Sequence, residues 1–258
     1  MTSIQTKADE LLRLHTSPEL LSVVNVWDVI SARAVADIPE TTALATASHS
    51  IAALYGYEDG ENIPVELMID MIGRIAGSTD LPVSADLEAG YGNAGETTRR
   101  AIGVGIVGAN LEDQMKPLDE AVAAVKAVVA AGRAENVNFV LNARTDAFVK
   151  AGDRPVDDVV ADAIERGRAF LDAGAACVFV PGKLDLTTVE RLVEGIGQYR
   201  VSVIGVPGSL APATLEKLGV ARISYGPWTQ RVALTALADL AIDLYANGEL
   251  PGGTRPLN

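Results

Sequence analysis

Short apolar runs recur along the chain, and each ends in polar residues that are followed by a turn. Runs of this length, bounded by turn residues, are typical of strands that are buried on both faces. We therefore expect strands within residues 23–28, 42–47, 82–88, 108–113, 138–145, 176–182, 201–208 and 221–227.

The segments between these runs are typical of helices. Two of them, 118–132 and 155–174, carry acidic residues near their start, where the helix dipole favours negative charge. Further helices are expected over 64–78, 186–197 and 229–248, of which the last is the longest. Eight rounds of strand and helix without a linker predict a single α/β domain over residues 1–258, folded as a closed (β/α)₈ TIM-type barrel.

Charge and composition narrow the possible functions. The net charge of −13 argues against nucleic acid or an anionic membrane surface as a partner. A small anionic substrate is compatible with this charge where a metal ion or an arginine inverts the local field. Cys177 is the only cysteine, no apolar leader opens the chain, and no run is long enough to span a membrane. We therefore expect a cytoplasmic protein without an internal disulfide.

Acidic residues stand where several predicted strands end. Asp86 and Glu88 end one strand, Glu112 ends the next, and Asp59 lies in the loop after the second strand. Active sites of such barrels lie at these strand ends. Side chains two apart on a strand share a face, so Asp86 and Glu88 are expected to point the same way. Converging carboxylates repel unless a cation lies between them, and oxygen ligands without His or Cys indicate Mg²⁺ or Mn²⁺.

These charged residues also have structural alternatives. Acids at strand ends are often helix caps or solvated loop residues, which is the interpretation we favour for Glu58, Asp113 and Asp146. Arg144 ends the fifth run and, beside a metal, can bind a carboxylate or phosphonate with two hydrogen bonds. Its alternative role is an ion pair with Glu112 or Asp146, and the two roles are compatible.

Six stretches together resemble the isocitrate lyase / phosphoenolpyruvate phosphonomutase superfamily. They follow in the family's order from about residue 20 to residue 231, and they read VVNVWDVISARAVAD, LATASHSIAALYGYEDGE, LPVSADLEAGYGN, GANLEDQ, LNARTDAF and ISYGPWTQR. The resemblance implies a barrel that binds Mg²⁺ through acids at strand ends and holds a 2-oxo acid or its enolate on that metal. It also implies a homodimer or homotetramer in which the last helix, 229–248, is exchanged between subunits.

The resemblance assigns site residues position by position. Asp86 and Glu88 match the two acids of the family's D-x-D strand, from which Glu88 departs by one methylene. Together with Glu112 and Asp59 they are the expected metal ligands. Arg144 matches the family's substrate-gripping arginine, and Arg144 and Glu112 are the expected catalytic residues. The expected substrate-binding residues are Trp27, Thr46, Ala47, Ser48 and Arg144, with packing as the alternative role for Trp27.

The chain departs from the family after the fourth strand. Cysteine-dependent lyases carry a K-K-C-G-H-type loop there, whereas LEDQMKPLDE runs almost directly from Glu112 into a helix. The long lid of the phosphonomutases is also absent or shortened. Cys177 lies inside a predicted strand and is expected to be a core residue, and Lys116 is expected to be a solvated surface lysine.

Three further features have open roles. His15 is expected to be exposed on an N-terminal helix. His49 follows the carboxylate-binding segment and is either an acid–base group or a structural residue. GVPGS, after the seventh strand, can bind a phosphate in a barrel, although the resemblance does not require it.

We expect a Mg²⁺-dependent carbon–carbon lyase or decarboxylase that acts on a small 2-oxo or 2-hydroxy (di)carboxylate through a metal-stabilised pyruvate enolate. The missing cysteine loop disfavours isocitrate or methylisocitrate cleavage and leaves oxaloacetate-type decarboxylation as the least demanding reaction. One alternative is a mutase or hydrolase that acts on a P–C bond in phosphonopyruvate or phosphoenolpyruvate. Others are a non-catalytic member that binds a 2-oxo acid and a metal, and an unrelated barrel whose acids cap helices.

Overall fold

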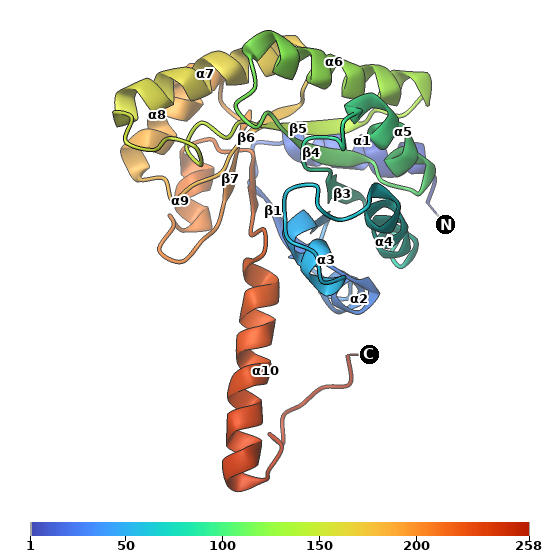
Figure 1. Ribbon diagram of the computed structural model, residues 1–258. Coiled ribbons are helices and arrows are strands. Elements are labelled where there is room, and N and C mark those ends of the chain that lie inside the picture. Colours follow the sequence, from blue (N-terminus) through green and yellow to red (C-terminus); the bar gives the residue numbers. More distant parts are fainter. Residues whose placement is uncertain (1, 258) are drawn as a thin grey trace.

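The strands form a closed parallel barrel, as the sequence predicts. The computed structural model describes residues 2–257, in which eight strands pair in chain order and the last closes on the first (Figure 1). They are β1 (Leu21–Val26), β2 (Leu44–Thr46), β3 (Val83–Asp86), β4 (Gly108–Glu112), β5 (Val140–Arg144), β6 (Cys177–Val180), β7 (Val201–Ile204) and β8 (Arg222–Ser224). All but β1 are shorter than the predicted runs, because the runs continue into the loops at the end of the barrel.

The helices surround this barrel, and the five that the sequence predicts are present within two residues of their expected ends. The helices are α1 (Ile4–Thr16), α2 (Val29–Ala36), α3 (Ser48–Leu54), α4 (Val65–Gly77), α5 (Ala94–Gly103), α6 (Leu118–Ala134), α7 (Val156–Asp172), α8 (Leu186–Ile196), α9 (Pro212–Lys217) and α10 (Trp228–Asn247). Asp28, Asn93 and Asp185 cap α2, α5 and α8 through hydrogen bonds from backbone N–H groups of the first turn. These bonds satisfy donors that a helix start leaves unpaired.

Helix α1 closes the N-terminal end of the barrel. Its Ala8 and Leu11 are fully buried and pack with residues at the beginnings of the strands. A Cβ added at Gly108 would lie 2.7 Å from Leu11 Cδ2 and 2.7 Å from the Val140 carbonyl oxygen, so only glycine permits this close packing. A ligand therefore has access only from the opposite, C-terminal end.

The register of the sheet aligns the polar strand ends at that open end. Asp86 is level with Asn110 on the neighbouring strand, and Glu112 is level with Arg144. The last residues of β3, β4 and β5 therefore meet at one edge of the barrel, as expected for an active-site face.

His15 is fully buried, which contradicts the prediction that it is exposed. Its Nδ1 lies 2.9 Å from the Leu11 carbonyl oxygen, and its Nε2 lies 3.4 Å from Nη1 of Arg222, which is itself buried inside the barrel. A guanidinium can only donate, so Nε2 accepts and the proton of the neutral ring is on Nδ1. The prediction was wrong because the sequence of α1 does not reveal the arginine that the ring meets.

The buried neutral His15 should make the protein less stable in acid. Burial lowers the pKa of His15 to about 3 from 6.5, and Arg222 adds to the effect. Between these values the unfolded chain binds one proton more than the folded chain. The contribution of His15 is therefore complete above about pH 6.5 and is lost as the pH falls. From about pH 7.5 to about pH 5 the loss should be about 2 kcal/mol.

Urea unfolding at both pH values, in chelator, measures this loss when wild type is compared with His15→Gln. The carboxylates at the open end titrate in both proteins, so the difference between the two pH dependences isolates His15. Equal pH dependences would contradict the prediction, because they would show that His15 has the same pKa in the folded and the unfolded chain.

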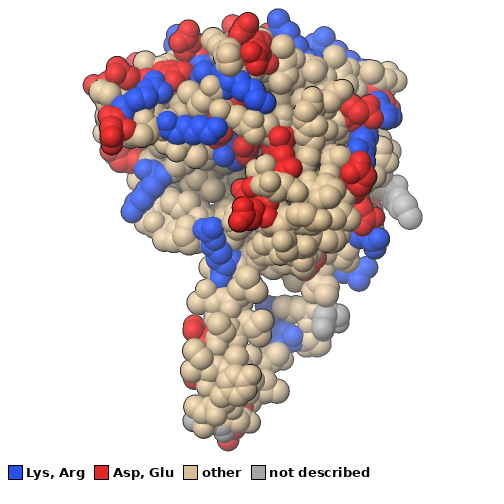
Figure 2. All heavy atoms as spheres, viewed as in Figure 1, with Lys and Arg blue, Asp and Glu red and all other residues tan. Residues whose placement is uncertain are grey.

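Helix α10 leaves the barrel and projects away from the other helices (Figure 1). Its exposed apolar side chains are Val232, Leu234, Leu237, Ile242 and Tyr245, the last of which is 92% exposed. They are not confined to one face, and the projecting part carries few charged groups compared with the body (Figure 2). Such a surface is typical of a protein interface, and exchange of α10 between subunits stays a prediction. No helix within residues 2–257 has the length and apolar character needed to cross a membrane.

Candidate functional site

A cavity of about 290 Å³ lies at the C-terminal end of the barrel. All eight strands or the loops after them contribute to its wall. Its charged and polar lining residues are Asp59, Asp86, Arg144, Lys183, Asn25, Ser48, His49, Asn110 and Ser224. A concave cavity with a few convergent polar groups on this face is the expected place for a small-molecule site.

Two acids meet at one hydroxyl in this cavity. Asp86 is the last residue of β3, and Ser48 Oγ donates to its Oδ2 at 2.9 Å. Asp59, from the loop between α3 and α4, has its Oδ1 3.4 Å from the same hydroxyl. The Thr46 hydroxyl accepts a hydrogen bond from the backbone N–H of Asp86 at 3.0 Å, which fixes the strand end. The predicted proximity of these two acids is therefore observed.

Arg144 links two further acids at the end of β5. Its Nη1 donates to Glu112, and its Nε donates to Asp146 Oδ1 at 2.8 Å. The Asp146 side chain is 2% exposed, so this ion pair is largely shielded from water. Nη2 has no hydrogen-bond partner among residues 2–257, and Arg144 lines the cavity. The structural role considered for Arg144 is thus present, and one nitrogen remains for a ligand.

Burial controls the electrostatics of these acids. Burial raises the pKa of Asp86; Arg144 opposes the shift and Asp59 adds to it. Burial also raises the pKa of Glu112, again against Arg144 and together with Asp86. Because each ionised carboxylate disfavours ionisation of the next, a cation bound between Asp86 and its acidic neighbours would stabilise their charged forms.

Glu88 is placed differently from the expectation that it shares the direction of Asp86. Strand β3 ends at Asp86, and Glu88 has a φ of +51°, so the alternation of a strand does not reach it. Its carboxylate accepts hydrogen bonds from the Glu61 backbone N–H and, at 2.6 Å, from the Tyr91 hydroxyl. Burial raises the pKa of Glu88 to about 7, although the Tyr91 bond opposes the shift. The second acid of SADLEAGYGN is thus held beside the cavity by the neighbouring loop.

The donor set fits a hard divalent cation that keeps most of its water. Among the described residues, no three His, Cys, Asp or Glu side chains form a ready-made metal-binding group. Mg²⁺ commonly takes only one or two carboxylates directly and retains several waters. Asp59 and Asp86, which converge on Ser48, match that requirement, whereas a fully preformed four-carboxylate site is not observed.

The expected substrate-binding residues divide between two cavities. Ala47 and Ser48 line the acidic cavity, and Thr46 lies directly behind them with its hydroxyl on Asp86. Trp27 instead lines a separate cavity of about 420 Å³ on the outside of the barrel, next to α2 and the start of α10. The structure therefore favours the packing role for Trp27.

The segment after β4 is a short, fixed turn, as its length predicts. Gln114 and Met115 have φ values of +51° and +57°. Asp113 Oδ1 accepts a hydrogen bond from the Met115 N–H at 2.9 Å, and Asp113 Oδ2 is 3.1 Å from Arg166 Nη1. Lys116 is exposed. Asp113 is 4% exposed and does not cap α6, so the favoured role as a helix cap or solvated loop residue is wrong and the residue instead fixes this turn. Among the described residues, no long lid follows this strand.

The single cysteine has no place in the cavity. Cys177 is fully buried in β6, where burial raises the pKa of its thiol to about 12.

His49 does line the cavity, and its Nδ1 is buried without a partner among the described residues. Asn25 and Asn110 were not anticipated, although a polar residue inside an otherwise apolar run was the available signal.

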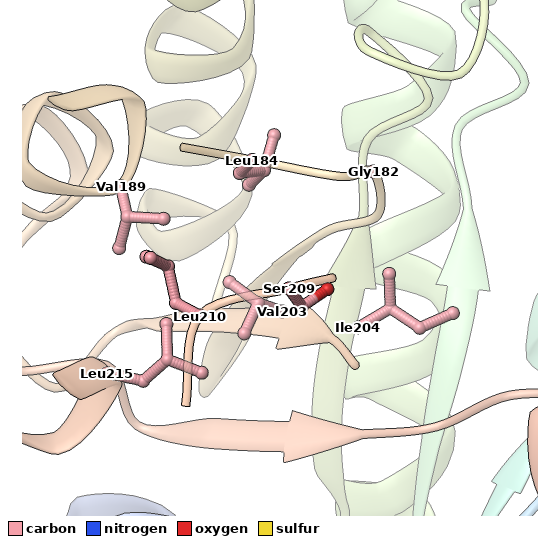
Figure 3. Close-up of a pocket in the computed structure, with 8 residues that line it drawn as sticks. All are labelled: Gly182, Leu184, Val189, Val203, Ile204, Ser209, Leu210 and Leu215. Carbon is pink, nitrogen blue, oxygen red and sulfur yellow. The ribbon is translucent and has the colours of Figure 1, made fainter. Parts of the chain in front are cut away.

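A third cavity, which is apolar, lies behind the wall formed by β6 and β7. Leu184, Val189, Val203, Leu210 and Leu215 point toward one another there (Figure 3). Its volume of about 10 Å³ is at the lower limit for one water molecule. This space is a packing gap between strands and helices and is too small for a substrate.

Comparisons with known proteins agree with this fold and show the family of the chain. Residues 11–245 match the model of the family described as phosphoenolpyruvate phosphomutase. A crystal structure from Burkholderia cenocepacia J2315, provisionally assigned as a phosphonomutase, is 38% identical, covers 91% of this chain and 98% of its own, and has a TM-score of 0.85. Oxaloacetate acetylhydrolase in complex with its product oxalate is 25% identical, with coverages of 98% and 92% and a TM-score of 0.86.

A curated relative supports the same assignment. The oxaloacetate decarboxylase of Paraburkholderia xenovorans (strain LB400) is 28% identical over 95% of this chain and 84% of its own length. The closed barrel, the acids at its strand ends and the match over residues 11–245 lead to one conclusion. The chain belongs to the phosphoenolpyruvate phosphomutase family, within the superfamily of phosphoenolpyruvate mutases and isocitrate lyases.

Proposed function

We propose that this protein is a Mg²⁺-dependent enzyme, with Mn²⁺ as a substitute, that cleaves a carbon–carbon bond in a small 2-oxo or 2-hydroxy dicarboxylate. Oxaloacetate decarboxylation is the leading reaction. The observation that carries the proposal is the convergence of Asp59, Asp86 and Arg144 on one cavity. Two of the relatives described above are named for reactions of oxaloacetate, which supports the substrate class.

Each charged group has a distinct part in this proposal. Asp59 and Asp86 would hold the cation, and Glu88 and Glu112 would support them from neighbouring positions. When bound there, a divalent cation would supply a Lewis acid that stabilises negative charge on the 2-oxygen of the substrate. Arg144, oriented by Glu112 and Asp146, has Nη2 available to bind the substrate's carboxylate.

The short turn after β4 favours decarboxylation among the reactions considered. A reaction that transfers a phosphoryl group within the site must keep water away from the group in transit. Residues 113–117 are held by Asp113 and contribute no long cover over the cavity. Loss of carbon dioxide needs neither a lid nor a general acid at the leaving group.

The second candidate function is P–C bond chemistry on phosphonopyruvate or phosphoenolpyruvate. The family match and the similarity to the Burkholderia phosphonomutase favour it. A non-catalytic member that binds a 2-oxo acid would use the same acids and Arg144. These three possibilities differ in turnover, not in the architecture of the cavity.

Pyruvate release in the presence of Mg²⁺ tests the proposal. We expect turnover of oxaloacetate above the rate with Mg²⁺ alone, and loss of that turnover in EDTA. The substrate panel should include phosphonopyruvate, isocitrate and methylisocitrate, with phosphoenolpyruvate measured as the product of a mutase and glyoxylate as the product of isocitrate cleavage. Calorimetry should measure oxalate binding in parallel. Turnover of phosphonopyruvate alone would select the second candidate. Mg²⁺-dependent oxalate binding without any turnover would contradict the enzymatic proposal, and no oxalate binding would contradict the metal site as well.

A further inference from the structure

The wall of the cavity formed by β6 and β7 differs from the acidic wall. In a closed barrel of eight strands, β6 and β7 lie opposite β2 and β3. Asp86 ends β3, and Asp59 lies after β2, in the loop between α3 and α4. The β6–β7 wall presents the apolar side chains of Phe179, Ile204 and Val206, together with Lys183 from the loop after β6. The cavity therefore has two cationic positions, Arg144 and Lys183, which come from different parts of the barrel.

Lys183 differs from Arg144 because no protein acid neutralises it. Among residues 2–257, no carboxylate lies within ion-pair distance of its ammonium group. Its Nζ packs against the GVPGS loop, where a Cβ added at Gly208 would lie only 2.8 Å away. Gly208 has a φ of +81°, so both its conformation and its missing side chain leave room for the ammonium group.

We propose that Lys183 binds the distal acid group of the substrate. The GVPGS loop, described above as a segment that can bind a phosphate, instead provides the space for this lysine. The inference rests on the proposed function, in which the 2-oxo acid end of the substrate lies at Asp59, Asp86 and Arg144. A substrate that reaches across the cavity places its carbon chain against Phe179 and Ile204 and its second acid group at Lys183. The site thus selects dicarboxylates over monocarboxylic 2-oxo acids.

The physical reason is the balance of charge across the cavity. The charges of Asp59 and Asp86 need a cation, and the first acid group of the substrate is bound by Arg144. A second carboxylate on an apolar wall would be buried without a partner unless Lys183 contacts it, because an unpaired buried charge is costly. A contact between two charged groups that lose water is also stronger than a surface ion pair.

Ligand binding to Lys183→Gln tests this assignment by calorimetry at low ionic strength with Mg²⁺. Oxalate occupies only the 2-oxo acid end, whereas malate carries a distal carboxylate. We expect malate to bind about tenfold more weakly to the variant and oxalate to bind within twofold of wild type. Lys183→Arg should restore most of the malate affinity. Lys217→Gln, on the exposed end of α9, is the matched control and should change neither ligand.

The outcomes separate this inference from the proposed function. Unchanged malate affinity, or an equal loss for malate and oxalate, would overturn the role of Lys183 while leaving the acid cluster as the metal site. Failure of wild type to bind oxalate in a Mg²⁺-dependent way would overturn both.

Discussion

An Arg144→Lys enzyme should keep its fold and lose about a hundredfold to a thousandfold in kcat/KM for the 2-oxo acid that wild type turns over. The guanidinium donates to Glu112 and Asp146 through two different nitrogens and still has Nη2 for the substrate. An ammonium group is a single point and cannot reach both acids while presenting a planar pair of donors. The positive charge is preserved in this variant, so the loss of kcat/KM measures the contribution of the planar arrangement of donors.

The matched control is Arg166→Lys, which removes a guanidinium from a comparable setting outside the cavity. Arg166 has an 11% exposed side chain and bridges Asp113 and Asp162. This variant should lose stability in urea unfolding and keep kcat/KM within about threefold of wild type. If Arg144→Lys behaves like Arg166→Lys, Arg144 is only an ion-pair partner and the substrate is bound elsewhere.

Asp86→Asn should abolish Mg²⁺-dependent oxalate binding and make the metal-free protein more stable. The amide has the shape of the carboxylate and keeps an oxygen for Ser48, but it carries no charge for a cation. Metal affinity should fall by at least about a hundredfold. Burial and Asp59 both raise the pKa of Asp86, so its ionised form opposes folding and the neutral amide does not.

Thermal unfolding with EDTA and with Mg²⁺ measures both effects. The melting temperature of Asp86→Asn should exceed that of wild type in EDTA, and it should not respond to Mg²⁺. Asp162→Asn, which alters a carboxylate paired with Arg154 and Arg166 away from the cavity, should leave the Mg²⁺ response intact. A Mg²⁺ response that survives in Asp86→Asn would place the cation at other ligands.

Much of the barrel was predictable because its signal is local. Each strand is a short apolar run, and each predicted helix ended within two residues of its expected position. The proximity of Asp86, Glu112 and Arg144 followed from the rule that parallel strands end at one edge. Register then decides which of them are level, and Glu112 beside Arg144 is a pairing that periodicity alone does not specify.

The remaining features depend on backbone that leaves the regular pattern or on contacts that are distant in sequence. Glu88 lies beyond the end of β3 and has a positive φ, so the alternation of the strand does not determine where its side chain lies. Lys183 faces the cavity from a loop, where no period relates one side chain to the next. His15 meets Arg222 across 207 positions of sequence. None of these placements has a signature within one element.

The fixed turn at residues 113–117 has a stereochemical consequence for the proposed reaction. With no long cover from this turn, water reaches the carbon that loses carbon dioxide and is its proton donor in the proposed reaction. A carbon chain that lies against Phe179 and Ile204 has one face covered by this wall, so solvent delivers the proton to the opposite face. A substrate with a substituent at that carbon would therefore give one mirror-image product in excess, although no protein acid delivers the proton.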